Sequence, residues 1–254
     1  MKELKIEIGK KAYTYGVPEV WADVGQDGFV ALVKELRAGS ADRVSRALAM
    51  QVCGIELGCA LAMGAYHWHV LTEELRWMLS PGGDDDGEGA IDCLLVEDML
   101  VDGVKMVGYE PDFSNTTWEE FCAADSFAMM GNDAGLCSVL YRPERVPADA
   151  ERDFRIDYSA YGAMNRRERF THVDSDLLLA ARVNYMVLRS LFVRRYPHVF
   201  VEGDGNGGGD GVSWSRVTKM IVGDRIGEWE AYNRLPCDVV LSRIESAIVE
   251  KDGR

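Results

Sequence analysis

The chain has 254 residues, of which 47% are hydrophobic, so it is long enough to fold around a core of its own. Its formal net charge of −14 disfavours nonspecific binding to nucleic acids and to anionic membranes. No apolar run is long enough to span a bilayer, and the charged N-terminus lacks the apolar stretch of a signal peptide. We therefore expect a cytoplasmic protein, with its six scattered cysteines reduced.

The charge is unevenly distributed along the chain. Residues 142–195 contain 11 arginines, no lysines and 8 acidic residues, a net charge of +3. The remaining residues carry 17 basic and 34 acidic side chains, a net charge of −17. This split fits ordinary ion pairs on solvated helices, or a surface that docks an acidic partner or a second copy.

Residues 1–80 are expected to form an N-terminal hairpin followed by a helical lobe. Apolar and charged residues alternate on both sides of Gly9-Lys10, which predicts two short strands and a turn. Apolar residues from Phe29 onward recur at helical spacing up to Gly39, and Ser40 is the expected N-cap of the next helix. Helical spacing then continues to Leu79.

Residues 81–90 have the composition of an acidic, glycine-rich loop and are the best candidate for a boundary between lobes. Residues 91–254 are expected to form a second helical lobe, packed with the first as one continuous unit. Its first part, residues 91–110, fits either a hairpin around Asp102-Gly103 or a helix followed by a strand.

The rest of the second lobe shows mostly helical patterns. Thr116 or Thr117 can begin a capping box ahead of a helix, and residues 136–141 predict a second, short one. Residues 145–171 predict a long connection with one short helix, and a helix of about five turns follows from Asp174. Further helices are expected towards the C-terminus. The predicted fold is mainly α with small β elements, a helical bundle with an N-terminal hairpin and a possible central one.

The glycine-rich segment at residues 203–211 has three interpretations. Its glycines match the G-x-G-x-x-G dinucleotide fingerprint, and residues 205–213 approach a calcium-binding nonapeptide. The fingerprint requires a preceding strand and a βαβ unit, and the nonapeptide requires stacked copies, neither of which the sequence supplies. We therefore interpret the segment as a connector, with Ser213 as the N-cap of the next helix.

Two groups of polar residues merit testing as sites. His67 and His69, with Glu73 one turn after His69, are the only weak candidates for a metal site, although residues two apart on a helix point in different directions. Arg166, Arg167 and Arg169 could contact phosphates, but a strongly acidic chain argues against nucleic-acid binding. No acid–base pair or nucleophile motif stands out, so we expect no catalytic residues, no cofactor and no enzymatic activity.

Several fragments, in order along most of the chain, together resemble a family of phage and prophage proteins encoded among tail genes and described as tail assembly chaperones. The fragments are KIEIGKKAYTYGVPEVWADV, FVALVKEL, TTWEEFCAADSF, LCSVLYRPE, LRSLFVRRYPHVF, WSRVTKMIVGD and LPCDVVLSRIE. Each is a short helix or turn pattern with one or two aromatic anchors. The acidic loop and the glycine-rich segment fall outside them.

The resemblance implies a non-enzymatic protein that binds another phage tail protein in the host cytoplasm, such as a long helical tape-measure-like chain. The net charge argues against a membrane or nucleic-acid partner, and a homo-oligomer is possible. The candidate contact residues are Trp118, Trp214, Trp229, Arg166, Arg167 and Arg169. Two alternatives stay open: a structural component of the tail or neck, and a metal-dependent enzyme that uses His67 and His69.

Overall fold

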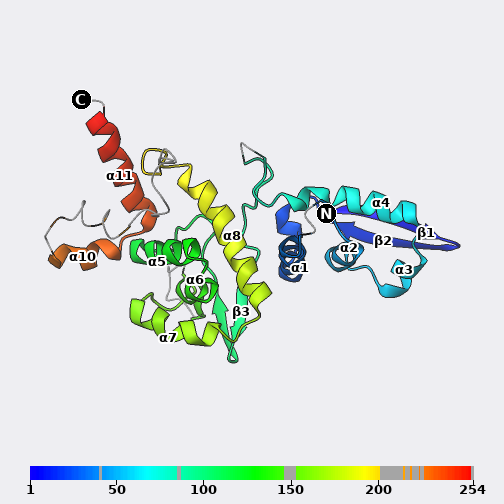
Figure 1. The fold of residues 1–254 in the computed structure, drawn as a ribbon, viewed down its shortest axis with the longest axis horizontal. Coiled ribbons are helices and arrows are strands. Elements are labelled where there is room, and N and C mark those ends of the chain that lie inside the picture. Colours follow the sequence, from blue (N-terminus) through cyan, green and yellow to red (C-terminus); the bar gives the residue numbers. More distant parts are fainter. Residues whose placement is uncertain are drawn as a thin grey trace. The chain divides into compact units, whose positions relative to one another are not determined.

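The structure is a computed structural model that describes residues 1–39, 42–84, 87–145, 153–200, 214, 218, 223 and 226–252. The chain divides into two compact units (Figure 1). The first consists of Met1–Val96 with Asp174–Val187, and the second of Glu97–Val173 with Leu188–Arg254. The fold is mainly α with small β elements, as predicted. Within the described ranges, no helix combines the length and apolar character needed to cross a bilayer.

The first unit begins with the predicted hairpin. Strands β1 (Lys2–Ile8) and β2 (Lys11–Val17) are antiparallel. The turn requires a left-handed residue, and Gly9 supplies it with a φ of 64°. Ile6 and Val17 are buried, so one face of this two-stranded sheet contributes to the core of the unit.

Short helices make up most of the first unit (Figure 1). They are the 3-10 turns η1 (Trp21–Asp23) and η2 (Arg76–Leu79) and the helices α1 (Gln26–Arg37), α2 (Arg46–Cys53), α3 (Leu57–Ala62) and α4 (Ala65–Glu74). The N-cap of α2 is Ser45, whose hydroxyl accepts a hydrogen bond from the Leu48 N–H at 3.0 Å. The expected cap, Ser40, lies outside the described residues. Trp21, Phe29 and Leu32 are buried in the core.

The acidic loop after η2 is tied to the first unit. The Asp84 carboxylate accepts a hydrogen bond from the Glu88 N–H at 2.7 Å, and the Ile91 N–H donates to the Pro81 carbonyl at 3.0 Å. The Trp21 indole donates to the Gly89 carbonyl at 2.8 Å. These bonds give the described part of the loop a folded turn, and the division of the chain falls after Val96.

The second unit contains an antiparallel three-stranded sheet in the order β3 (Asp98–Val101), β4 (Val104–Val107) and β5 (Arg142–Pro143). Asp102 and Gly103 both have positive φ, 50° and 77°, as a two-residue hairpin turn with right-handed strand twist requires. Of the two possibilities for residues 91–110, the hairpin is therefore the correct one.

The helices of the second unit are α5 (Trp118–Met129), α6 (Asp133–Leu140), α7 (Ala160–Phe170), α10 (Ile226–Asn233) and α11 (Cys237–Asp252). The predicted capping box is present: the Thr117 hydroxyl accepts from the Glu120 N–H at 3.3 Å. The start of α11 is joined to the start of α5, because the Trp118 N–H donates to the Leu235 carbonyl and the Cys237 N–H donates to the Thr116 carbonyl.

Helix α7 is more extensive than the short helix expected within residues 145–171. It buries Ala163, Arg166 and Phe170, whereas Tyr161 and Met164 are exposed. An arginine therefore replaces one of the apolar residues that normally mark a buried helix face. The arginine on the buried face of α7 explains why the apolar pattern of this segment looks irregular in the sequence.

Helix α8 (Ser175–Val193) matches the helix predicted from Asp174 onward. The Asp174 carboxylate accepts a hydrogen bond from the Asp176 N–H at 2.7 Å. The residues of α8 up to Val187 belong to the first unit, and those from Leu188 belong to the second. The glycine-rich segment at residues 203–211 and Ser213 lie outside the described residues, so their interpretation stays a prediction.

Candidate functional site

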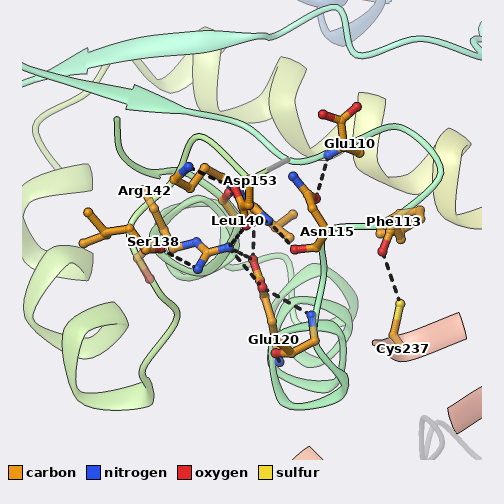
Figure 2. Close-up of polar contacts among 12 residues, drawn as sticks. Glu110, Phe113, Asn115, Glu120, Ser138, Leu140, Arg142, Asp153 and Cys237 are labelled. Carbon is orange, nitrogen blue, oxygen red and sulfur yellow. Dashed lines mark hydrogen bonds and ion pairs between the residues drawn. The ribbon is translucent and has the colours of Figure 1, made fainter. Parts of the chain in front are cut away.

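The second unit holds a cluster of buried charged side chains (Figure 2). Glu120 of α5 is fully buried, and its Oε1 lies 3.0 Å from Arg155 Nη1 and 3.2 Å from Arg142 Nη2. Asp153 closes the cluster, with its Oδ1 2.9 Å from Arg155 Nε and its Oδ2 3.2 Å from Arg142 Nη2. Two carboxylates thus face two guanidinium groups.

The two arginines of this cluster also donate to backbone carbonyls. Arg155 donates to the carbonyls of Leu140 at 2.9 Å and Asn115 at 2.6 Å, and Arg142 donates to that of Ile156 at 2.7 Å. Buried charges are stable only when they are paired and hydrogen-bonded in this way. The cluster consequently ties the N-terminal region of α5 to the end of α6, to β5 and to the segment before α7.

Burial determines the electrostatics of the cluster. Burial raises the pKa of the Glu120 carboxyl, and the charges of Arg155 and Arg142 oppose that shift. Burial also lowers the pKa of the Arg142 guanidinium, against the effect of Glu120. The two carboxylates and the two guanidinium groups are equal in number and bonded to one another. We therefore assign the cluster a structural role, which is to hold α5, α6 and β5 in position.

Arg166 extends this arrangement to α7. Its Nε and Nη2 donate to the Ser138 carbonyl of α6 at 3.2 and 3.0 Å, and the side chain is buried. Gly162 makes room for it, since a β-carbon at this position would lie 3.0 Å from Arg166 Nη1 and 2.8 Å from the Ser159 hydroxyl. Helices α5, α6 and α7 are therefore connected by buried polar contacts.

On the outside of these helices, large apolar side chains face the solvent. Met130, at the end of α5, is 67% exposed, and Tyr161 and Met164 of α7 are 72% and 65% exposed. Phe127 of α5 and Arg167 of α7 join the two helices, with the guanidinium carbon 5.6 Å from the ring centroid. We call these five residues the α5–α7 surface. Exposed apolar side chains on ordered elements are typical of protein-binding surfaces.

The three arginines singled out in the sequence have three different environments. Arg167 belongs to the α5–α7 surface, and Arg166 is buried against α6. Arg169 pairs with Asp102 at 2.7 Å and donates to the Val101 carbonyl at 3.2 Å, which ties α7 to the β3–β4 turn. The three residues therefore do not form a shared anion site.

The three candidate tryptophans do not join the α5–α7 surface. Trp118 and Trp214 are buried; their indoles donate to the Thr218 hydroxyl at 2.9 Å and the Asp125 carboxylate at 2.7 Å. Trp229 is half-buried and donates to the Gly223 carbonyl at 3.3 Å. Trp118 and Trp214 are thus core residues, and neither is available as an exposed anchor.

The weak metal candidates lie on α4 in the first unit. The Gly64 N–H donates to His67 Nδ1 at 3.3 Å, so His67 contributes to the cap of the helix. His69 is exposed, and Glu73 pairs with Arg76 at 3.6 Å. Among the described residues, no three histidine, cysteine or acidic side chains are grouped so that they could hold a metal ion.

Sequence reasoning missed Met130, Tyr161 and Met164 and the cluster around Glu120. One signal was present: Phe170 lies one turn after Arg166 on the same face of α7, whereas Tyr161 and Met164 lie on other sides of the helix. This arrangement indicates their exposure once α7 is known to pack through Arg166. The partners of Glu120 carry no local signal, because Arg155 is 35 residues away in the chain.

The comparisons with known proteins supply no family. No family model, no curated protein and no solved structure matches this chain.

Proposed function

We propose that this protein is a non-enzymatic assembly chaperone or adaptor that binds a helical segment of another phage tail protein, such as a tape-measure-like chain. The α5–α7 surface is the observation that supports the proposal most directly. Its Met130, Tyr161 and Met164 expose large apolar side chains on helices that buried polar contacts hold in place. The resemblance of the sequence fragments to tail assembly chaperones supplies the class of partner.

The chemistry of this surface suits a helical partner. Methionine is flexible and polarizable, so it adapts to the varied apolar face of a partner helix. Apolar residues at helical spacing on a partner can pack against such exposed side chains. The net charge of −14 would keep the resulting complex soluble.

Co-expression with a tape-measure-like tail protein, followed by size-exclusion chromatography, tests the proposal. We expect the two chains to elute together. We also expect the triple variant Met130→Ser, Tyr161→Ser, Met164→Ser to elute alone. The matched control is the variant Leu57→Ser, Leu61→Ser on α3, whose side chains are similarly exposed, 65% and 80%, but lie in the first unit. This control should retain the complex.

Three results would count against the proposal. Elution of the wild-type chain without partner in every co-expression would remove the chaperone role. If the α3 control variant lost the complex and the triple variant kept it, the binding site would lie outside the α5–α7 surface. Finally, recovery of the chain from assembled tails by mass spectrometry would assign it to the particle as a structural component, because a chaperone leaves before assembly is complete.

A further inference from the structure

Arg167 is exposed and has no carboxylate partner among the described residues, unlike several other arginines of the second unit. Arg169 pairs with Asp102, and Arg145 lies 3.4 Å from Asp157. Arg189 of α8 pairs with Asp125. In a chain with 42 acidic and 28 basic residues, an exposed arginine that pairs with none of the described carboxylates is notable.

The helix that carries Arg167 cannot supply the missing acid. Side chains three and four positions apart are neighbours on a helix surface. Those positions around Arg167 hold Ala163, Met164, Phe170 and Thr171, none of which is acidic. Glu168 follows directly and therefore points to a different side of α7.

The packing of Phe127 fixes the orientation of Arg167. Phe127 lies against α6, since a β-carbon at Gly135 would come within 2.6 Å of its ring. The guanidinium carbon of Arg167 lies over this ring, 5.6 Å from the ring centroid. Such a contact covers one side of a guanidinium and leaves N–H groups able to bind a carboxylate with two hydrogen bonds.

We propose that the α5–α7 surface binds an acidic amphipathic helix, whose apolar face packs on Met130, Tyr161 and Met164 and whose carboxylate pairs with Arg167. This inference rests on the proposed function and adds the chemistry of the partner. The complementary charge is the exposed guanidinium of Arg167, which pairs with no carboxylate among the described residues. An anionic membrane or a nucleic acid is disfavoured as occupant, because its dense array of phosphates is repelled by the net charge of −14 more strongly than the few carboxylates of one helix.

Two synthetic peptides test the inference with the full-length protein. Both form amphipathic helices with leucine and methionine on one face; one has glutamates flanking that face, and the other has glutamines in their place. Fluorescence anisotropy measures the Kd of each. We expect the glutamate peptide to bind about threefold to fivefold more tightly, the gain that one exposed ion pair gives. The variant Arg167→Gln should abolish this preference.

The variant Arg169→Gln is the matched control, because it removes the same charge from the same helix at a residue already paired with Asp102. It should keep the preference for the glutamate peptide. Equal binding of the two peptides, or equal effects of the two variants, would overturn the inference while leaving the apolar surface intact. Tighter binding to phosphatidylserine vesicles than to the glutamate peptide would overturn it as well.

Absence of binding to both peptides would also overturn the inference. It would leave the proposed function to the co-expression experiment, which uses a natural tail protein and does not depend on the acidic character of the partner. The two hypotheses therefore fail separately. The Met130→Ser, Tyr161→Ser, Met164→Ser variant should lose both peptides, which distinguishes binding at this surface from binding elsewhere.

Discussion

Arg155 and Arg145 are close in the chain but differ in what surrounds their guanidinium groups. Arg155 is buried, and its Nη1 lies 3.0 Å from the buried Glu120. Arg145 is partly exposed and lies 3.4 Å from Asp157, which is exposed to solvent. The free energy of an ion pair depends on this difference, because removing one partner of a buried pair leaves an uncompensated charge in the interior.

Replacing Arg155 with methionine should therefore destabilise the protein far more than replacing Arg145. We expect Arg155→Met to lower the free energy of unfolding by about 3–5 kcal/mol and Arg145→Met to lower it by at most about 1 kcal/mol. Urea unfolding followed by circular dichroism measures both. Equal losses for the two variants would show that the buried cluster contributes no more than a surface pair.

A residue's role was the hardest property to infer from the sequence. Arg166 and Arg167 are adjacent, yet one donates to a carbonyl of α6 and the other lies over Phe127 of α5. Their partners come from 28 and 40 residues away in the chain, so no local pattern distinguishes the two side chains. The burial of Trp118 and Trp214 could not be inferred from the local sequence either, because large aromatic residues occur in both cores and interfaces.

Elements defined by local signals were predicted correctly. The N-terminal hairpin, α1, α5 and α8 each carry a turn residue, a cap or an apolar stripe within a few positions. Residues 91–110 were ambiguous because a hairpin and a helix followed by a strand share the same apolar run. The positive φ of Asp102 and Gly103, which decides between them, is a property of the folded turn.

The acidic loop shows how one element depends on a single backbone conformation. Gly82 and Gly83 are adjacent, but their surroundings differ. Gly83 has a φ of 74°, and a β-carbon there would lie 2.5 Å from the Glu88 carbonyl oxygen. A β-carbon at Gly82 would meet nothing within 4 Å. The two positions therefore form a matched pair for substitution.

We expect Gly83→Ala to lower the free energy of unfolding by about 2–3 kcal/mol, because alanine is strained at positive φ and its methyl group clashes with the loop backbone. Gly82→Ala should change it by less than about 0.5 kcal/mol. Thermal unfolding measured by tryptophan fluorescence is suitable, since Trp21 donates to Gly89 in the same loop. A larger loss for Gly82→Ala would contradict the loop conformation.

At the scale of the whole molecule, each unit is built from two separate stretches of the chain. Composition points to residues 81–90 as a boundary, whereas the contacts divide the chain after Val96, after Val173 and within α8. Discontinuous units leave no mark in local composition, because their segments meet only in the folded protein. Asn184 illustrates this: it accepts a hydrogen bond from the Leu95 N–H at 2.7 Å and donates to the Cys93 carbonyl at 3.0 Å.

Helix α8 should consequently couple the stability of the two units. Val187 is the last α8 residue of the first unit, and Leu188 is the first of the second. The variant Val187→Pro removes an N–H donor and clashes with the preceding turn, at a cost of about 3 kcal/mol. Because both units contain part of α8, we expect faster hydrogen exchange in β1 and β2 and also in α5 and α6.

The variant Ala247→Pro in α11 provides the control for this prediction. Ala247 is exposed and belongs to the second unit alone, so this proline should raise exchange in α11 and leave β1 and β2 unchanged. Exchange in the full-length chain, followed by digestion and mass spectrometry of the peptides, resolves these regions. Unchanged protection of β1 and β2 in Val187→Pro would mean that the first unit is stable without a continuous α8. The stability of each unit would then have to come from its other segments.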